Sequence, residues 1–566
     1  MISAAQLLKK FGHTRFNAPQ EQVIKNLLAG RNTLCLMPTG AGKSLCYQLA
    51  GRLMKKTTVV LFPLRALAAQ QALILREEHG LDVTAIDAGM SGQEQYKQLT
   101  NLLNQPPDFI FFSVERASQD GYLEYVLRRL RDKIGLVTVD EAHCVSQWGD
   151  NFRPAYKEIP DFLNRIFLQA PKPPLLCLTA TLNDKDQEEI CRDFAIAPSD
   201  VMRSASLFRT NLELRREVLA DENTKVARLE QLLREHDGEK VLIYVHRKRG
   251  AHGTAALNEA FRAKGFLCDY FDADLDTDER NRVLENFRSG DKLIVFATGA
   301  FGMGIHIPDI RAIIHYLMPE SIEQYYQEAG RGGRDGKPSV CHLLFTETNI
   351  RVRRDLIKAG FPGAKTLSAF YRDVLHFEEG DTAELEPLTA LNDENLLCFY
   401  LLKSAGVFEV IARGLRSVQD FSSNGAPTQF NEYAAASRLG LLRIISNKTN
   451  TPLQDIMTDL FRWFAEGRLK LARAPGKMLF VQKSKELTAD VLVEIEATIA
   501  DKKAYRLDAL DKFVAMIKSA EPVEDTIRAH LNLNASVRRQ VRRTRKKRKT
   551  RSRGKAIGRE SNRARR

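Results

Sequence analysis

A glycine-containing segment near the N-terminus has the composition of a phosphate-binding loop. It reads MPTGAGKS over residues 37–44, between an apolar strand-like run and a helix-like stretch. Gly40 and Gly42 would let the backbone curl so that its N–H groups face a polyphosphate, and Lys43 would supply a positive charge to the terminal phosphates. The Ser44 hydroxyl is a suitable Mg²⁺ ligand. The segment predicts a nucleoside triphosphate site with Mg²⁺, whose contacts would be Thr39, Gly40, Ala41, Gly42, Lys43 and Ser44.

Two adjacent carboxylates follow a later apolar run. The segment VTVDEAHC spans residues 137–144 and places Asp140 and Glu141 at the end of a strand-like stretch. Asp140 is suited to hold Mg²⁺, directly or through water, and Glu141 is suited to polarise an attacking water. The alternative is an acidic strand end that only caps a helix. The phosphate-binding loop earlier in the chain favours phosphoryl transfer.

Two arginines in the second half of the chain could complete such a site. They occur in QEAGRGGRDG, residues 327–336, where Arg331 and Arg334 could share one face of a helix. Guanidinium groups that reach a γ-phosphate stabilise the transition state of phosphoryl transfer. Because this segment is far along the chain from the phosphate-binding loop, we expect the site to be complete only when two lobes meet. The predicted catalytic set is Lys43, Asp140, Glu141, Arg331 and Arg334.

Short runs rich in β-branched and aromatic residues must position these motifs. Helix-like stretches separate the runs, a rhythm typical of βαβ units and parallel sheets. Nucleotide sites of such sheets lie at the carboxyl ends of the strands, where the motifs above fall. We predict an α/β fold with two tandem parallel-sheet lobes, over residues 1–205 and 206–350. The expected strands are 33–38, 58–62, 109–113, 135–140 and 175–179 in the first lobe, and 241–245, 267–271, 293–297, 312–316 and 340–345 in the second.

The pattern becomes mostly helical in the C-terminal part of the chain. Residues 351–484 are predicted to form an accessory region of winged-helix type. Within it, RLKLARAPGKMLFVQKS at residues 468–484 predicts a β-hairpin that turns at residues 474–476. A further helical region is expected over residues 485–537.

The net charge of +14 is concentrated at the C-terminus. Residues 538–566 contain 16 Lys or Arg and one acidic residue, Glu560, so residues 1–537 are close to neutral. This basic tail has too few large apolar residues to form a core and is predicted to be disordered when free. It could bind phosphate backbones or act as a nuclear import signal, and a merely solubilising tail is the alternative.

Other features limit the class of protein. No apolar run approaches the roughly 18 residues that span a bilayer. Residues 1–10 end in Lys9 and Lys10 and are typical of an amphipathic helix, not of a secretory signal. The eight cysteines form no CxxC pair, so we expect buried, reduced thiols and no zinc site. These observations predict a protein of the cell interior without a membrane partner.

Longer motifs around the chemical residues resemble the RecQ family of DNA helicases. The most specific is DEAHCVSQWGDNFRPAY, residues 140–156, which is similar to the aromatic-rich loop of that family. ATGAFGMGIHIPDIR at residues 297–311 and ESIEQYYQEAGRGGRDG at residues 320–336 resemble later helicase motifs, in the same order. The similarity covers about residues 10–345.

The resemblance implies two RecA-like lobes and a motor, dependent on ATP and Mg²⁺, that moves 3′ to 5′ on single-stranded DNA and separates duplex DNA. Trp148, Phe152 and Arg153 would contact the strand, because aromatic faces stack on unpaired bases and arginine binds phosphate. The other residues that the resemblance implicates are Gln147 and His143 between this loop and the ATP site, Thr179 and Thr181 between the lobes, and Gly302 at the nucleotide.

The sequence also departs from the family. Gln20 is in place to contact the adenine edge, but His13 and Asn17 stand where tyrosine and arginine are usual, which argues against a strict adenine preference. The four-cysteine zinc subdomain of typical members is either missing or rebuilt without metal, since Cys398 is the only cysteine beyond Cys341. The predicted hairpin could act in its place as a strand-separating wedge.

Two other functions remain open at this stage. An RNA helicase or remodeller would use the same ATP chemistry, and a basic tail binds any polyanion. A nucleic-acid-binding scaffold with a vestigial motor is the other, although all five predicted catalytic residues are present. We expect the protein to be cytoplasmic and associated with the nucleoid if it is bacterial, and to be nuclear if it is eukaryotic.

Overall fold

The structure of the protein is a computed structural model. The residues that it describes are 4–38, 40–86, 90–145, 154–180, 182–204, 208–302, 305, 307–377, 381–423, 425, 427–472 and 477–531.

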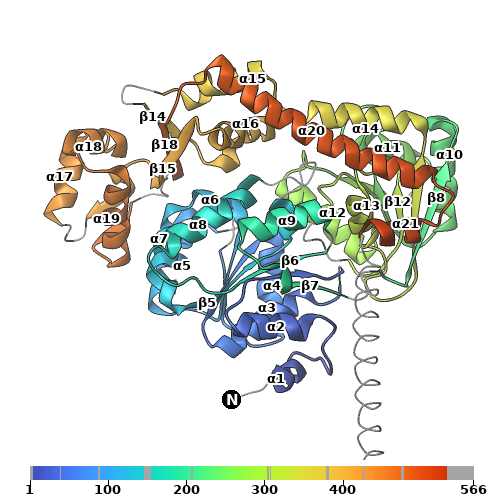
Figure 1. Cartoon of the computed structure of the whole chain (residues 1–566), viewed down its shortest axis with the longest axis horizontal. Helices are drawn as coiled ribbons and strands as arrows, with labels where there is room; N and C mark the ends of the chain where they lie inside the picture. The colour runs from blue at the N-terminus through green and yellow to red at the C-terminus, as the bar shows by residue number, and fades with distance from the viewer. Residues whose placement is uncertain are drawn as a thin grey trace, which may run out of the picture.

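Lobe 1 is a seven-stranded, fully parallel sheet covered by helices on both faces (Figure 1). The strand order is β3-β4-β2-β5-β6-β1-β7. The strands are β1 (Thr33–Leu36), β2 (Thr57–Phe62), β3 (Val83–Ala85), β4 (Phe109–Ser113), β5 (Ile134–Val139), β6 (Leu175–Thr179) and β7 (Val201–Arg203). The helices are α1 (Ala4–Lys10), α2 (Gln20–Leu28), α3 (Lys43–Met54), α4 (Arg65–Glu77), α5 (Gly92–Asn104), α6 (Val114–Gln119), α7 (Gly121–Leu130), α8 (Ile159–Ile166) and α9 (Asp184–Asp193), with short 3₁₀ turns that include η2 (Ala142–Val145) and η3 (Pro154–Glu158).

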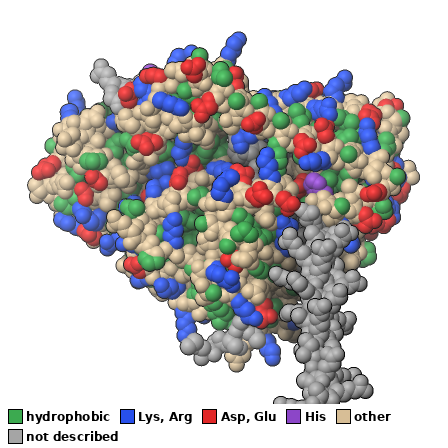
Figure 2. All heavy atoms as spheres, in the orientation of Figure 1, with side chains coloured by type: hydrophobic (Ala, Val, Ile, Leu, Met, Phe, Trp, Pro, Cys, Tyr) green, Lys and Arg blue, Asp and Glu red, His purple; other side chains and the backbone are tan. Residues whose placement is uncertain are grey.

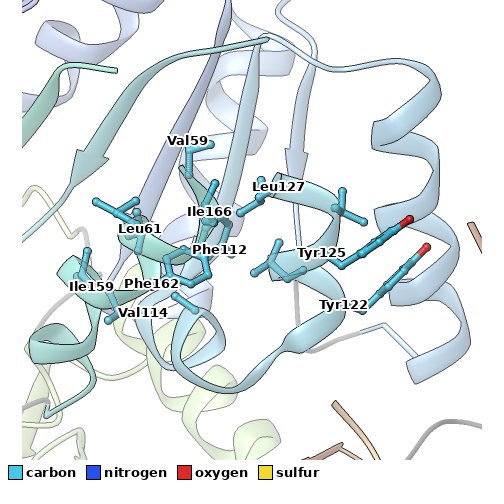
Figure 3. Close-up of a cluster of buried hydrophobic side chains, with 14 of the residues drawn as sticks. Val59, Leu61, Phe112, Val114, Tyr122, Tyr125, Leu127, Ile159, Phe162 and Ile166 are labelled. Carbon is cyan, nitrogen blue, oxygen red and sulfur yellow. The ribbon is translucent and has the colours of Figure 1, made fainter. Parts of the chain in front are cut away.

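Apolar side chains on both faces of the strands explain why this sheet is buried. On one face, Val59, Leu61 and Phe112 of the strands pack against Phe162 and Ile166 of α8 (Figure 3). All five predicted strands of this lobe are confirmed to within two residues. The edge strands β3 and β7 were missed, because three-residue strands carry little periodicity.

Lobe 2 is a six-stranded parallel sheet in the order β10-β11-β9-β12-β13-β8. Its five predicted strands are confirmed, and the added strand β8 lies at the edge. The two-lobed α/β fold class is therefore confirmed. The strands are β8 (Leu212–Val218), β9 (Lys240–Tyr244), β10 (Cys268–Phe271), β11 (Ile294–Ala297), β12 (Ile310–His315) and β13 (Ser339–Phe345), and the helices are α10 (Glu222–Glu235), α11 (Thr254–Ala263), α12 (Thr277–Ser289), α13 (Ile322–Ala329) and α14 (Glu347–Ala359).

The accessory region packs on lobe 1 (Figure 1). Phe461 and Phe464 of α19 lie against Tyr122 of α7, with ring centroids 5.2 and 5.5 Å apart. Its helices are α15 (Ala364–Ala369), α16 (Asp393–Ser404), α17 (Thr428–Ala436), α18 (Leu442–Thr449) and α19 (Leu453–Ala465), and its strands are β14 (Thr382–Leu385), β15 (Phe408–Leu415), β16 (Phe421–Ser423), β17 (Leu469–Leu471) and β18 (Lys477–Lys483).

The predicted hairpin over residues 468–484 is wrong in its pairing. Its two strands exist as β17 and β18, but β17 pairs with β16, and β18 lies between β14 and β15. Both strands therefore find antiparallel partners that precede the three helices α17–α19 in the chain. The observed long-range pairing buries Leu479 and Val481 in the accessory core, and this burial favours it over a hairpin formed through the local turn. The predicted turn at residues 474–476 lies outside the described residues.

Two C-terminal helices complete the described chain. They are α20 (Ala489–Lys518) and α21 (Val523–His530), and α20 runs from the accessory region to lobe 2 (Figure 1). Lys and Arg are interspersed with Asp and Glu over the visible face, as expected for a nearly neutral body (Figure 2). None of the described helices combines the length and the apolar content needed to cross a bilayer. All eight cysteines are free, and only Cys191 is partly exposed.

Candidate functional site

The phosphate-binding loop joins β1 to α3 at the carboxyl edge of the lobe 1 sheet. Gly40 and Gly42 have φ angles of 80° and 83°, a left-handed backbone that favours glycine. Helix α3 begins at Lys43 without a capping side chain, so its first N–H groups point to an anion-binding position. The Lys43 ammonium is buried and makes no hydrogen bond to a described residue. A buried cation that lacks a hydrogen bond, at a helix N-terminus, is the arrangement that a phosphate group would satisfy.

The acid pair follows β5 at the same edge of the sheet. The Asp140 backbone is held at both ends, since its N–H donates to the Leu61 carbonyl and its carbonyl accepts from the Tyr156 hydroxyl at 2.9 Å. Glu141 has a φ angle of 49°, in the left-handed region that costs a non-glycine residue free energy. This backbone places Glu141 Oε1 3.9 Å from Lys43 Nζ. Strain of this kind is typical of a residue whose position matters for function.

The two carboxylates have opposite electrostatic environments. Burial raises the pKa of Asp140, and the charge of Glu141 raises it further. Burial also opposes ionisation of Glu141, but Lys43 and His143 hold the pKa of Glu141 below its usual value. Glu141 is thus ionised at neutral pH and can orient a water, while Asp140 would gain from a bound cation.

His143 connects this pair to the second lobe. Its Nδ1 lies 3.2 Å from the Thr179 hydroxyl at the end of β6 and 3.3 Å from Glu141 Oε2. Its Nε2 lies 3.3 Å from Nε2 of Gln327 on α13. Although burial acts in the opposite direction, Cys144 and Glu141 raise the pKa of His143 to about 10. His143 Nδ1–H can donate to Glu141, and its Nε2 faces the side-chain amide of Gln327, so this one ring contacts both lobes.

The predicted common helical face for Arg331 and Arg334 is wrong. Helix α13 ends at Ala329, and both arginines follow it in a tight turn. The turn depends on Gly332, where a Cβ atom would collide with the Ser339 hydroxyl, and on Gly333, whose φ is 53°. Gly332 therefore packs closely against β13, and the chain forms this turn where α13 would otherwise continue for another helical turn.

The turn nevertheless brings both guanidinium groups near the acid pair, with Arg331 buried and Arg334 half-buried. Arg331 is 7% exposed, and its charge contributes to the lowered pKa of Glu141. Arg334 donates to the Ile305 carbonyl at 2.9 Å. Burial and repulsion from Arg331 lower the pKa of Arg334 to about 9, so it stays cationic at neutral pH. A Cβ atom on Gly302 would lie 3.6 Å from Arg331 Nη2, which places this predicted nucleotide contact beside the cluster.

Gln20 lies against the phosphate-binding loop. Its Nε2 donates to the Gly42 carbonyl at 2.9 Å, and its Oε1 accepts from the backbone N–H of Asn17 at 2.8 Å. Asn17 Nδ2 reaches the Ala41 carbonyl at 3.4 Å. The adenine-contact role of Gln20 remains a prediction, and the structure adds a role in shaping the loop.

Several predicted site residues lie outside the described residues. They are Thr39, Gln147, Trp148, Phe152, Arg153 and Thr181. Conversely, Gln327 and Tyr156 contact this site but were not among the predicted site residues, although both occur in the quoted motifs. No sequence signal identifies the Gln327–His143 contact, because it joins residues 184 positions apart.

The described residues fit a Mg²⁺–nucleoside triphosphate. Lys43 Nζ and the Nε atoms of Arg331 and Arg334 are buried without hydrogen-bond partners among the described residues. All three cations interact electrostatically with Glu141, and an anionic phosphate chain would relieve their mutual repulsion. Ser44 and Asp140 are the residues present to bind the metal.

Comparisons with known proteins identify the family of the two lobes. The DEAD/DEAH box helicase family matches residues 17–190, and the helicase conserved C-terminal domain family matches residues 224–336. The ATP-dependent DNA helicase RecQ of Bacillus subtilis is 33% identical over 361 residues, which cover 63% of this chain and 59% of that protein. The probable ATP-dependent DNA helicase RecS of Bacillus subtilis is 30% identical over 380 residues, 67% of this chain and 74% of that protein.

The chain belongs to the RecQ family of DNA helicases. The match to the first of these RecQ-family relatives spans about three fifths of that relative's length. A solved structure of Mss116p bound to single-stranded RNA and AMP-PNP has a TM-score of 0.50 and 16% identity, over 63% of this chain and 75% of that one, and shares the fold. All the described residues of the predicted site lie within the matched segments, whereas α15–α21 follow them.

Proposed function

We propose that this chain is an ATP-dependent DNA helicase that moves 3′ to 5′ on single-stranded DNA and separates duplex DNA. The observation that carries the proposal is the meeting of Lys43 and Glu141 from lobe 1 with Arg331 from lobe 2, next to the His143–Gln327 contact. The relatives named as ATP-dependent DNA helicases support DNA as the substrate.

In the proposed reaction each group has one task. Lys43, Arg331 and Arg334 hold the phosphate oxygens on which negative charge develops. Ser44 and Asp140 hold Mg²⁺, which neutralises phosphate charge when bound. Glu141 orients the attacking water and accepts its proton. Because the cations come from both lobes, hydrolysis and phosphate release would change how strongly the lobes attract each other.

The DNA-coupling part of the proposal rests on the family resemblance. Trp148 and Phe152 would stack on unpaired bases and Arg153 would bind phosphate, while Gln147, His143, Thr179 and Thr181 would report strand binding to the ATP site. The basic tail, residues 538–566, would add contacts to the phosphate backbone that do not depend on sequence. The protein would act at the bacterial nucleoid or in a eukaryotic nucleus.

The test is steady-state ATP hydrolysis with and without single-stranded DNA, with Lys43→Ala as the control. Strong stimulation by DNA that disappears in the variant supports the proposal. Absence of hydrolysis under both conditions would overturn it and favour a scaffold. Matched DNA and RNA duplexes with 3′ or 5′ overhangs then test the substrate and the direction, and a preference for RNA would favour an RNA helicase.

A further inference from the structure

The C-terminal strap, defined here as α20 and α21 (residues 489–531), belongs to two cores. The 30 residues of α20 give a length of about 45 Å. Its N-terminal half buries Ile495 and Ile499 in the accessory core, and its C-terminal half buries Leu510 and Phe513 in lobe 2. The strap is therefore an integral part of lobe 2 that also reaches the accessory region.

The middle of α20 contacts both motor lobes with consecutive residues. Arg506 is buried and forms a bidentate ion pair with Glu320 of lobe 2, at 3.0 Å from Nε and 2.6 Å from Nη2. The Tyr505 hydroxyl donates to Asp186 Oδ1 at 3.0 Å and accepts from Asn183 Nδ2 at 2.8 Å, both in lobe 1. Adjacent helical residues point about 100° apart, so one turn of α20 holds both lobes.

These contacts connect to the two segments that line the nucleotide site. Asn183 caps α9 four residues after Thr179, the partner of His143. Asn183 Nδ2 also lies 3.4 Å from Glu323, which is on α13 four residues before Gln327. His530 of α21 contacts the same Glu323 oxygen at 2.8 Å.

We propose that Tyr505 is a positioning residue for ATP hydrolysis, which holds Asn183 and Asp186 at the distance from α13 that brings the two halves of the site together. This inference rests on the proposed function. Arg506 fixes the strap to lobe 2, and the Tyr505 hydroxyl fixes lobe 1 to the strap. Lobe closure then depends on a helix far outside the matched helicase segments.

The first test compares Tyr505→Phe with Tyr371→Phe. Both changes remove a hydroxyl that donates to a carboxylate, but the Tyr371 hydroxyl contacts Glu486, away from the motor lobes. For Tyr505→Phe we expect DNA-stimulated kcat to fall about tenfold, as for loss of one hydrogen bond to a charged group. KM for ATP should change less than about twofold, because the lobe 1 phosphate contacts remain. Wild-type kcat in Tyr505→Phe would overturn the inference.

A double-mutant cycle with Asp186→Asn tests the route of the effect. If Tyr505 acts through Asp186, the double variant should lose no more than about twofold beyond the worse single variant. Fully multiplicative losses would show that Tyr505 does not act through Asp186 and would overturn the inference.

Hydrogen–deuterium exchange separates this inference from the proposed function. Tyr505→Phe should raise exchange in residues 183–190 and 322–329 of the full chain, whereas Tyr371→Phe should not. Absence of ATP hydrolysis by the wild-type protein would overturn the proposed function. The exchange experiment would then still test whether Tyr505 of the strap holds these two segments in place. Unchanged exchange in both segments would overturn the inference.

Discussion

Glu141 is held by backbone and by charge at once. Its left-handed φ of 49° directs the carboxylate to Lys43, and His143 contacts its other oxygen at 3.3 Å. The lowered pKa keeps this carboxylate ionised, although it is buried. A strained backbone and a buried charge both lower the free energy of unfolding, and residues that combine them are typical of functional sites. We therefore assign Glu141 the water-orienting role.

We expect Glu141→Gln to lower kcat for ATP hydrolysis by about 10²-fold or more, because an amide cannot accept the proton of the attacking water. Nucleotide binding should persist, since Lys43 and the loop backbone are unchanged. Steady-state hydrolysis and equilibrium binding of a fluorescent ATP analogue measure the two effects. Glu213→Gln, an exposed carboxylate in lobe 2, is the control. Near wild-type turnover would contradict the assigned role.

At the scale of elements, the contact of α9 with α20 predicts a pH dependence of stability. Burial raises the pKa of Asp186 to about 6, and Glu323 and Glu189 add to the rise, while bonds from Tyr505 and Asn183 oppose it. A carboxyl whose folded-state pKa is raised is protonated more readily in the folded than in the unfolded protein. The contribution of Asp186 to the free energy of unfolding therefore falls as pH rises from about 4 through 6, and it levels off above that.

Asp186→Asn removes this titration. The stability of the variant relative to the wild type should rise by about 2 kcal/mol between pH 4.5 and pH 7, from the shift of about two pKa units. Urea midpoints at four pH values measure the difference, and Glu285→Gln, which changes an exposed carboxylate of α12, is the control. A difference that is flat or falls with pH would contradict the assignment.

At the scale of the whole molecule, the charge is divided between a nearly neutral body and a basic tail. A tail with 16 cations should add non-specific affinity that depends steeply on salt. Removal of residues 538–566 should weaken duplex binding at low salt evenly across sequences and reduce the slope of log K against log salt. ATP hydrolysis without DNA should not change.

Fluorescence anisotropy at several salt concentrations measures the affinity for duplex DNA with and without the tail. A full-length variant with the tail Lys and Arg replaced by Gln keeps the chain length and removes only the charge. Unchanged slopes in both variants would show that the tail does not bind DNA and favour the solubilising alternative.

Local patterns in the sequence predicted the candidate catalytic groups and most of the strands. Gly40, Gly42 and Lys43 follow one apolar run, and Asp140 and Glu141 follow another, so the sites at these strand ends could be predicted. The physical reason is that backbone freedom, apolar alternation and side-chain charge act over a few neighbouring residues.

Tertiary structure alone decided how distant segments meet. It set the turn that carries Arg331, the pairing of β17 and β18 with strands before α17, and the contact of His143 with Gln327. It also placed Tyr505 of a C-terminal helix at lobe 1, 319 residues from Asp186. These contacts depend on which buried surfaces fit together across the whole chain, and no short segment carries that information.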